Sequence, residues 1–310
     1  MILTKLSKGD FEKILLKYNI GTYMSHKHLP EALETSCYKL ATSEGKFILN
    51  VFEKTPQKQV IFQLKVLDIL TKNKFDTPAL IKTKNKKYYI TYNKKRIFIQ
   101  EFFNGSRAHG FSNKEIAALG IKIAKLHKFL SKLKIGYCFA LRQRKFNELL
   151  APYGLRDTQT KVNIAIKKID FSKLKKGVIH GDITPANLLR SKQGKIVFID
   201  WDDMHADTYI YELAVFITHI LVKHKIIYKK QIKILIKSYE KLAGKLNADE
   251  KKALYIAVID RFLSALEWCA IQMRTHKDRE KEIHSWLIAV LNKQKLFAKW
   301  PLEDFLRNIE

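Results

Sequence analysis

Asp182, Asn187 and Asp200 lie at the ends of short apolar runs between residues 178 and 203. The segment VIHGDITPANLL (178–189) contains Asp182 and Asn187, and KIVFIDWDD (195–203) contains Asp200 at the end of an apolar run. Transfer of a phosphoryl group from ATP to a hydroxyl requires a carboxylate that accepts the hydroxyl proton, and it requires oxygen ligands that hold Mg²⁺ against the phosphates. Asp182 suits the first role because it lies in a tight loop, and Asn187 and Asp200 suit the second.

Short strands are expected to bring these side chains together. The loop HGDITPAN (180–187) follows a strand, and the runs LLR and KIVFID are typical of two strands joined by the turn SKQG. Pairing of those strands predicts that Asn187 lies near Asp200. The alternative is a polar hairpin with an Asx-type turn, in which Asp182 and Asn187 are only structural. The combination H-G-D-x-x-x-x-N with a following I-D-W favours a reaction centre.

This combination resembles the kinase-like small-molecule phosphotransferases, which include aminoglycoside phosphotransferases, choline kinases and homoserine kinases. GIKIAKLHKFL (120–130) is similar to the family's helix that ends in Leu-His, and YELA (211–214) is similar to its Tyr-Asp-Leu-Ala motif, with Glu212 replacing the Asp. The resemblance implies ATP and Mg²⁺ as cofactors. It also implies a two-lobed α+β fold of the protein-kinase type, with a small antiparallel-sheet N-lobe (1–103) and a large helical C-lobe (104–310).

The hydrophobic pattern of the chain is consistent with that organisation. Runs of alternating or continuous apolar residues predict two hairpins before residue 104, at 37–52 and 87–103. Apolar residues at helical spacing predict helices at 55–73, 112–133, 142–154 and 160–174, and several more between 209 and 310. Ser112, with Glu115 three residues later, predicts a capping box at the start of the second of these helices.

The N-terminal part resembles homoserine kinases of this family in particular. Residues 3–54 share their layout of a leading amphipathic helix, the segment YNIGTYMSHKHL, a Glu-x-Ser segment before a strand, and ILNVFEK; RFLSALEWC (261–269) resembles their late helix. HGDITPAN and IDWDD are nearer to the aminoglycoside and choline members. Homoserine is therefore the leading small-molecule hydroxyl substrate, and choline, ethanolamine or an aminoglycoside are the alternatives.

The expected nucleotide site departs from the family's usual pattern in two places. The family carries Lys or Arg on the strand FILNVF, where this chain has Asn50, and the usual Glu partner is absent from residues 56–70. Because both members of the ion pair are missing, neither charge is left without its partner. The loop PEALETSC (30–37) also lacks Gly, although Ser36 still offers a hydroxyl donor.

Other groups are expected to complete the nucleotide site. Lys46 and Lys54 share a strand face with Asn50 by the period of two, so either is a candidate to replace the missing cation. The resemblance implies that backbone groups between Glu101 and Phe103, in the hinge IQEFFNGS, bind the adenine. The expected nucleotide-binding residues are therefore Ser36, Asn50, Glu101 and Phe103.

Acidic residues near the expected metal site are candidates for binding the acceptor. Asp202 is placed to hold a substrate ammonium group, and the alternative is a solvated turn together with Asp203. An amino-acid acceptor needs both an anion and a cation from the protein, and Glu267 and Arg261 on the expected late helix offer one of each. Surface or core roles on that helix are the alternative. His180 is expected to fix the loop by hydrogen bonds rather than to react.

The chain is strongly basic, with 58 Lys and Arg against 30 Asp and Glu and a net charge of +28. A nucleic-acid binder is one interpretation. Most of the cations are Lys scattered along the chain, whereas Arg, the better reader of bases and phosphates, is scarce. Nucleic acid is therefore not the expected partner. Asn50, the loop without Gly and the high charge leave a non-catalytic binding protein of the same fold as the rival.

Several other classes are excluded by motifs that the sequence lacks. It contains no G-x-x-x-x-G-K-S/T, no G-x-G-x-x-G and no H-E-x-x-H, which argues against P-loop enzymes, Rossmann dehydrogenases and zinc proteases. It has no apolar run long enough to span a membrane and no signal-peptide core near its start. The three cysteines are far apart. We therefore expect a cytoplasmic monomer or homodimer without a membrane partner.

Overall fold

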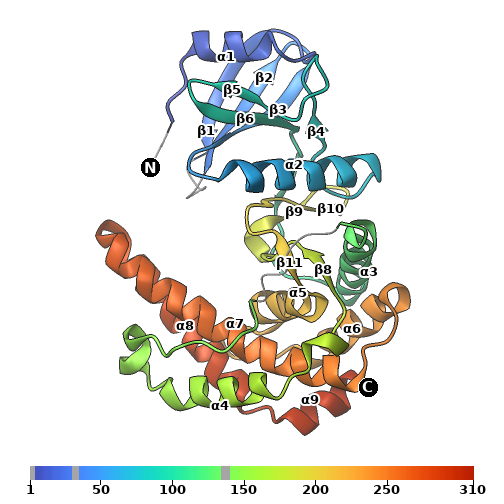
Figure 1. Ribbon diagram of the computed structural model, residues 1–310, viewed down its shortest axis with the longest axis vertical. Coiled ribbons are helices and arrows are strands. Elements are labelled where there is room, and N and C mark those ends of the chain that lie inside the picture. Colours follow the sequence, from blue (N-terminus) through green and yellow to red (C-terminus); the bar gives the residue numbers. More distant parts are fainter. Residues whose placement is uncertain (1–3, 30–34, 134–139) are drawn as a thin grey trace. The chain divides into compact units, whose positions relative to one another are not determined.

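The computed structural model describes residues 4–29, 35–133 and 140–310. The chain forms two compact units, whose elements are labelled in Figure 1. The first unit contains Met1–Arg107 and Leu188–Asp202, and the second contains Ala108–Asn187 and Asp203–Glu310. Each unit has its own arrangement of strands and helices.

An antiparallel sheet forms the centre of the first unit. Its strands pair in the order β1-β2-β3-β6-β4, and β5 pairs with β6. Asn93 and Lys94 make the turn from β5 to β6 with φ of 47° and 62°, the left-handed values that a two-residue hairpin turn requires. Both predicted hairpins are confirmed. The strands are β1 (Tyr23–Leu29), β2 (Thr35–Thr42), β3 (Gly45–Phe52), β4 (Leu80–Ile81), β5 (Ile90–Tyr92) and β6 (Lys95–Glu101).

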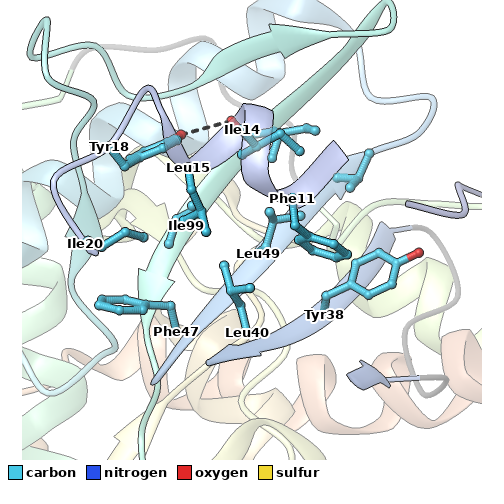
Figure 2. Packing of buried hydrophobic residues seen from close by; sticks show 12 residues of the cluster. Phe11, Ile14, Leu15, Tyr18, Ile20, Tyr38, Leu40, Phe47, Leu49 and Ile99 are labelled. Atoms are coloured by element: carbon cyan, nitrogen blue, oxygen red, sulfur yellow. Dashed lines mark hydrogen bonds between the residues drawn. The ribbon is translucent and has the colours of Figure 1, made fainter. Parts of the chain in front are cut away.

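A hydrophobic cluster joins helix α1 (Lys8–Leu15) to one face of this sheet, as Figure 2 shows. Phe11 of the helix and Leu40 and Leu49 of the strands are fully buried in it. Burial of a large apolar side chain contributes about 1.5–3 kcal/mol, so the cluster determines which face of the sheet is covered. Because side chains alternate along a strand, Asn50 lies on the opposite face from Leu49.

A second, three-stranded sheet attaches residues 188–202 to the first unit. Its order is β10-β9-β7. Thr77, which follows helix α2 (Gln57–Lys72), donates from Oγ1 to the Phe198 carbonyl at 2.8 Å and accepts from Trp201 Nε1 at 3.0 Å. The expected division into 1–103 and 104–310 did not include this return of the chain, because pairing with β7 is a long-range contact. The strands are β7 (Ser106–Arg107), β9 (Leu188–Arg190) and β10 (Ile196–Phe198).

Helices make up most of the second unit. Gly120 of α3 packs against α6 so closely that an added Cβ would lie 2.6 Å from the Leu235 carbonyl oxygen. Strand β8 (Lys176–Ile179) pairs with β11 (His205–Thr208). No helix within the described ranges is both long and apolar enough to cross a membrane. The helices are α3 (Asn113–Leu130), α4 (Arg156–Lys167), α5 (Tyr209–Phe216), α6 (Lys229–Ala243), α7 (Ala248–Thr275), α8 (Glu280–Ala298) and α9 (Leu302–Ile309).

The predicted helices of this unit are confirmed in part. The capping box of α3 is present: the Glu115 N–H donates to Ser112 Oγ at 3.3 Å, and the Ser112 N–H donates to Glu115 Oε2 at 2.8 Å. The helix predicted at 142–154 is wrong, because only a short 3-10 helix forms there, with Pro152 inside it and Gly154 ending it at φ 68°. Pro lacks the N–H that a longer helix needs.

The Asp10 carboxylate of α1 provides a test of the packing in the first unit. Its Oδ1 accepts from the Tyr92 hydroxyl at 2.6 Å, and its Oδ2 accepts from the Ser7 N–H at 2.8 Å. These bonds lower the pKa of Asp10 to about 2. Because the folded pKa lies below the unfolded value, the stabilisation is fully present above about pH 4 and is lost as the pH falls through 2.

We therefore predict that Asp10→Asn lowers the free energy of unfolding by about 1 kcal/mol at pH 7, and by less as the pH falls towards 3. Urea denaturation at several pH values measures this difference. Glu12→Gln is the matched control, because Glu12 is exposed on the same helix and its nearest cation, Lys8, is 3.7 Å away. A loss that is equal at pH 7 and pH 3 would contradict the assigned ionisation.

Candidate active site

The loop between β8 and β9 begins with a backbone turn that only Gly fits well. Gly181 has φ of +84°, and a Cβ at this position would lie 2.5 Å from the Asp203 carbonyl oxygen. Residues other than Gly rarely adopt this backbone conformation. The Gly at position 181 therefore permits the sharp turn that ends the β8 strand before Asp182.

Glu212 of α5 holds this turn in place. It is fully buried, and its carboxylate accepts the N–H of His180 at 2.6 Å and the N–H of Gly181 at 3.2 Å. Burial alone would raise the pKa of Glu212, but His127 at 3.8 Å, together with the other bonds, holds the pKa below its usual value. The carboxylate is therefore ionised and anchors the loop. The YELA motif contains this residue, but the motif alone does not predict the role.

Asp182 and Asn187 are joined directly. Asn187 donates from Nδ2 to the Asp182 carbonyl at 3.0 Å and to Asp182 Oδ2 at 2.7 Å. The Asp182 carbonyl also accepts the Thr184 N–H at 2.9 Å. With both protons of Nδ2 directed at Asp182, the amide oxygen Oδ1 of Asn187 points away from it. This oxygen is the atom that a metal ion would need.

Arg261 of α7 lies on the other side of the Asp182 carboxylate. Its Nη2 is 3.6 Å from Asp182 Oδ1, and the Asp182 side chain is 26% exposed. Burial raises the pKa of Asp182, and the nearby Arg261 charge opposes that shift. Asp182 is thus a basic carboxylate with one oxygen bonded to Asn187 and the other beside a cation.

Asp200 and Asp202 belong to the first unit. Asp200 is exposed and adopts φ of +63°, a left-handed conformation that is uncommon outside Gly and that is found often at functional sites. Asp202 Oδ1 accepts from Gln63 Nε2 of α2 at 2.7 Å. The buried Gln63 thus holds the segment after β10. Its polar side chain among the buried apolar residues of α2 is the sequence feature that indicates such a contact.

The structure separates the two side chains expected to bind nucleotide in the N-terminal strands. Ser36 pairs with Val51 and faces α1, where its hydroxyl donates to Glu53 Oε1 at 2.6 Å. Cys37 pairs with Asn50, and its thiol donates to Asn50 Oδ1 at 3.2 Å on the other face. Ser36 is therefore not placed beside Asn50, because a shift of one residue in register moves a side chain to the opposite face.

The Asn50 side chain is buried, and its Nδ2 has no hydrogen-bond partner among the residues that the structure describes. The carboxylates of Asp200 and Asp202 lie close enough to Cys37 to help raise its pKa, to about 11, although burial is the main cause. Asn50, Cys37 and these carboxylates therefore lie on the same side of the first unit. Residues 30–34 of the loop without Gly lie outside the described residues.

The other residues expected at the nucleotide site differ in exposure and in backbone hydrogen bonding. Lys46 and Lys54 are exposed, so neither is placed as a buried substitute for the missing cation. The N–H groups of Glu101 and Phe102 donate to the carbonyls of Ala79 at 2.9 Å and Lys46 at 3.2 Å. The sheet thus already uses these two donors, and the Glu101 side chain is exposed. Phe103, the next residue, follows the end of β6.

Of the acceptor-binding candidates, Glu267 and Arg261 lie in the same unit as Asp182, whereas Asp202 belongs to the first unit. Glu267 Oε1 accepts from Asn147 Nδ2 at 2.9 Å, and Glu267 Oε2 lies 3.9 Å from Arg144 Nη1. Among the described residues, no group of three or more His, Cys, Asp and Glu side chains is arranged to hold a metal ion. The expected ligands Asn187 and Asp200 include an amide.

Residues 27–225 match the phosphotransferase enzyme family, which is well over half of the chain. The chain belongs to this family. As a family member it is a small-molecule phosphotransferase whose acceptor group is an alcohol. The predicted family resemblance is therefore confirmed.

Curated relatives of this phosphotransferase are named homoserine kinases. The one from Methylocella silvestris is 26% identical over 224 residues, which is 69% of this chain and 70% of the relative. The one from Beijerinckia indica is 26% identical over 230 residues, with the same coverage. At this identity the relatives support the family rather than one acceptor.

Solved structures confirm the predicted α+β protein-kinase-like fold of this phosphotransferase. An amicoumacin kinase in complex with AMP-PNP, Ca²⁺ and its ligand is similar with a TM-score of 0.70 and 12% identity, over 96% of this chain and 95% of that one. The choline kinase LicA from Streptococcus pneumoniae is similar with a TM-score of 0.56 and 15% identity, over 87% of this chain and 94% of that one.

The anchoring role of Glu212 makes a prediction about stability. Glu212→Ala should lower the free energy of unfolding by about 3 kcal/mol or more, because it leaves the N–H groups of His180 and Gly181 buried without an acceptor. Glu212→Gln keeps one acceptor oxygen and should cost less. Urea unfolding measures both losses.

The exposed Glu282, which is paired with Arg279 at 2.9 Å, gives the matched control. Glu282→Ala should change the stability by about 0.5 kcal/mol or less. If Glu212→Ala were no more destabilising than Glu282→Ala, Glu212 would not hold the loop.

Proposed function

We propose that this phosphotransferase is a homoserine kinase that transfers the γ-phosphoryl group of ATP to the hydroxyl of L-homoserine. The observation that carries the proposal is the Asp182 carboxylate, which Asn187 holds at 2.7 Å. The names of the curated relatives and the N-terminal layout favour homoserine over other acceptors. Choline and aminoglycosides are the acceptors that a test must include, because fold neighbours of this chain act on such compounds.

In this proposal Asp182 accepts the proton of the homoserine hydroxyl as the oxygen attacks the γ-phosphorus. The bond between the γ-phosphorus and the bridging oxygen breaks, and ADP leaves with the electron pair. A carboxylate whose pKa is raised by burial is a better proton acceptor than an ordinary one, provided that it stays ionised. Arg261 supports the ionised form, and Asn187 fixes its direction. Positioning of the hydroxyl then supplies much of the rate.

Asn50 is proposed to bind a phosphate oxygen of the nucleotide through Nδ2. A buried donor without a partner costs about 1–3 kcal/mol, and a phosphate oxygen would supply the missing acceptor. The amide brings no positive charge, so its contribution is smaller than that of the family's usual Lys. The backbone around Glu101 and Phe103 is proposed to bind the adenine. Because the N–H groups of Glu101 and Phe102 already donate within the sheet, the carbonyl oxygens and the Phe103 N–H would make these bonds.

Mg²⁺ is proposed as the metal ion of the reaction, with Asn187 and Asp200 as its protein ligands. The donor set fits, because Mg²⁺ takes carboxylate and amide oxygens and keeps several waters. The Asn187 amide is oriented with Nδ2 towards Asp182, which leaves its Oδ1 for the metal. When bound, the ion would neutralise charge on the phosphates.

The assigned base gives a direct test of the function. Intact protein with Mg·ATP should phosphorylate L-homoserine in preference to choline, ethanolamine and aminoglycosides, as measured by ADP release and by product mass. Asp182→Asn should lower kcat by about 100-fold or more, because general-base catalysis typically contributes that much.

The stabilisation of the Asp182→Asn variant by Mg·ATP should be retained in a thermal-shift titration, which separates loss of chemistry from loss of folding. Asp157→Asn, at an exposed position of α4, is the control and should keep full activity. Full turnover by Asp182→Asn would rule out its role as the base.

The missing phosphate-binding cation gives a second test. Asn50→Asp keeps the size of the side chain but replaces the Nδ2 donor by an oxygen, which repels phosphate. It should raise the KM for ATP by about 10-fold or more while the KM for the acceptor changes little. Asn73→Asp, exposed at the end of α2, is the matched control. An unchanged KM for ATP in Asn50→Asp would show that Asn50 does not contact the nucleotide.

A further inference from the structure

A cluster of two arginines and two carboxylates lies beside Asp182 in the second unit. Arg144 Nη2 is bonded to Asp260 Oδ1, and Arg144 Nη1 lies 3.9 Å from Glu267 Oε2. Arg261 Nη2 lies 3.6 Å from Asp182 Oδ1. We call Arg144, Asp260, Arg261 and Glu267 the arginine–carboxylate cluster. Through Arg261 it reaches the carboxylate that accepts the hydroxyl proton in the proposed reaction.

Three polar atoms of this cluster are buried and have no hydrogen-bond partner among the described residues. They are the donors Nε of Arg144 and Nε of Arg261 and the acceptor Oδ2 of Asp260. The Asp260 side chain is fully buried, and the two arginine side chains are 21% and 20% exposed. Buried polar atoms are nearly always satisfied in proteins, so three such atoms in one cluster indicate that a ligand or ordered water completes it.

The chemistry of these atoms specifies the ligand. An anionic oxygen group would satisfy two guanidinium donors without acceptors, and a carboxylate matches a guanidinium in geometry and charge. The free oxygen of Asp260 would accept from a cationic N–H donor, and the partly exposed Glu267 adds negative charge beside it. Burial raises the pKa of Asp260 to about 6, with Arg144 and Arg261 opposing the shift, so Asp260 is largely ionised at pH 7. An α-amino acid carries both groups on one carbon atom.

The position of the cluster fits an amino acid whose hydroxyl reacts. Homoserine carries its hydroxyl two methylene groups away from the carbon that bears the carboxylate and the ammonium group. Arg261 Nη2 lies 3.6 Å from Asp182 Oδ1. A short ligand whose hydroxyl lies at Asp182 can therefore reach Arg261 with the carboxylate at its other end. A short hydroxyamino acid therefore matches both the reactive carboxylate and the unpartnered atoms.

We propose that Arg144 and Arg261 bind the carboxylate of an α-amino acid acceptor, while Asp260 and Glu267 bind its ammonium group. This assignment rests on the proposed function and deepens it, because it names the residues that select the acceptor class. Choline offers no carboxylate for the arginines and no N–H for Asp260. Ethanolamine and aminoglycosides offer ammonium groups but leave both Nε donors without an acceptor. Selectivity thus follows from the groups that a wrong acceptor leaves unpaired.

The intact wild-type enzyme provides the first test, with three acceptors that differ by one group each. L-homoserine is compared with 3-amino-1-propanol, which lacks the carboxylate, and with 4-hydroxybutyrate, which lacks the ammonium group. Each incomplete acceptor should show a kcat/KM at least ~100-fold lower than that of L-homoserine. If 3-amino-1-propanol is phosphorylated as well as L-homoserine, the enzyme is a phosphotransferase but the arginines do not bind a carboxylate.

Variants test the named residues. Arg144→Met alone would leave Asp260 buried beside an uncharged side chain and is expected to fold poorly. The double variant Arg144→Met/Asp260→Asn removes both charges together. It should raise the KM for L-homoserine by about 30-fold or more, leave the KM for ATP within about 2-fold, and abolish the preference over 3-amino-1-propanol. Arg156→Met, which removes an exposed arginine paired with Glu148, is the matched control.

A binding measurement separates this inference from the proposed function. L-2-aminobutyrate is homoserine without its hydroxyl, so it cannot be phosphorylated, and calorimetry measures its binding without turnover. Binding to wild type that is lost in the double variant supports the inference, even if L-homoserine is not phosphorylated and the proposed function fails. Phosphorylation of L-homoserine with an unchanged KM in the double variant would overturn the inference and leave the function standing.

Discussion

The buried Glu212 carboxylate is the constraint on which the candidate active site depends. A carboxylate with no exposure is costly to bury unless hydrogen bonds and a cationic or polar partner compensate it. Glu212 obtains that compensation from the N–H groups of His180 and Gly181 and from the nearby His127 ring. Burial lowers the pKa of His127, with Glu212 opposing the shift, so a polar ring rather than a full ion pair completes the anchor. The loop is held by its backbone, which leaves the Asp182 side chain available for chemistry.

A second constraint acts within the first unit, where the usual buried ion pair of the family is absent. Two buried neutral side chains lie in this unit: Asn50 accepts from the Cys37 thiol, and Gln63 donates to Asp202. One charged pair of this unit, Lys95 with Glu53 at 2.8 Å, lies on the α1 side with Ser36. Replacing a buried ion pair by neutral groups avoids the desolvation cost of two charges. It also leaves the recognition of phosphate to hydrogen bonds such as the one proposed for Asn50.

Local patterns in the sequence predicted much of the fold, because each depends on neighbouring residues. The hairpins and the capping box of α3 are of this kind. The direct bond between Asp182 and Asn187 was not predicted, although both residues lie in one loop. The attachment of residues 188–202 to the first unit could not be predicted, because pairing of β9 with β7 joins segments about eighty residues apart.

The side of the sheet on which Ser36 lies also could not be predicted. A one-residue change of register reverses the face of a strand, and the loop before β2 gave no turn signal that would have set the register. Arg144 was also missed, since nothing in its local sequence marks it. Its position becomes meaningful only when α7 brings Asp260 and Glu267 beside it. Residues that act through tertiary contacts of this kind are the ones that a sequence alone does not identify.

The positive charges of the surface and of the candidate site come from different residue types. The net charge of +28 comes mostly from lysines, and a lysine ammonium group is strongly hydrated and favours solvent. Arginine is scarce in this chain, yet Arg144 and Arg261 are both largely buried and both contact carboxylates. A guanidinium is more weakly hydrated and offers donors in a fixed plane, so it tolerates burial and selects planar anions. In a chain that uses lysine for its surface charge, the two buried arginines therefore have the chemistry that the proposed binding of a carboxylate requires.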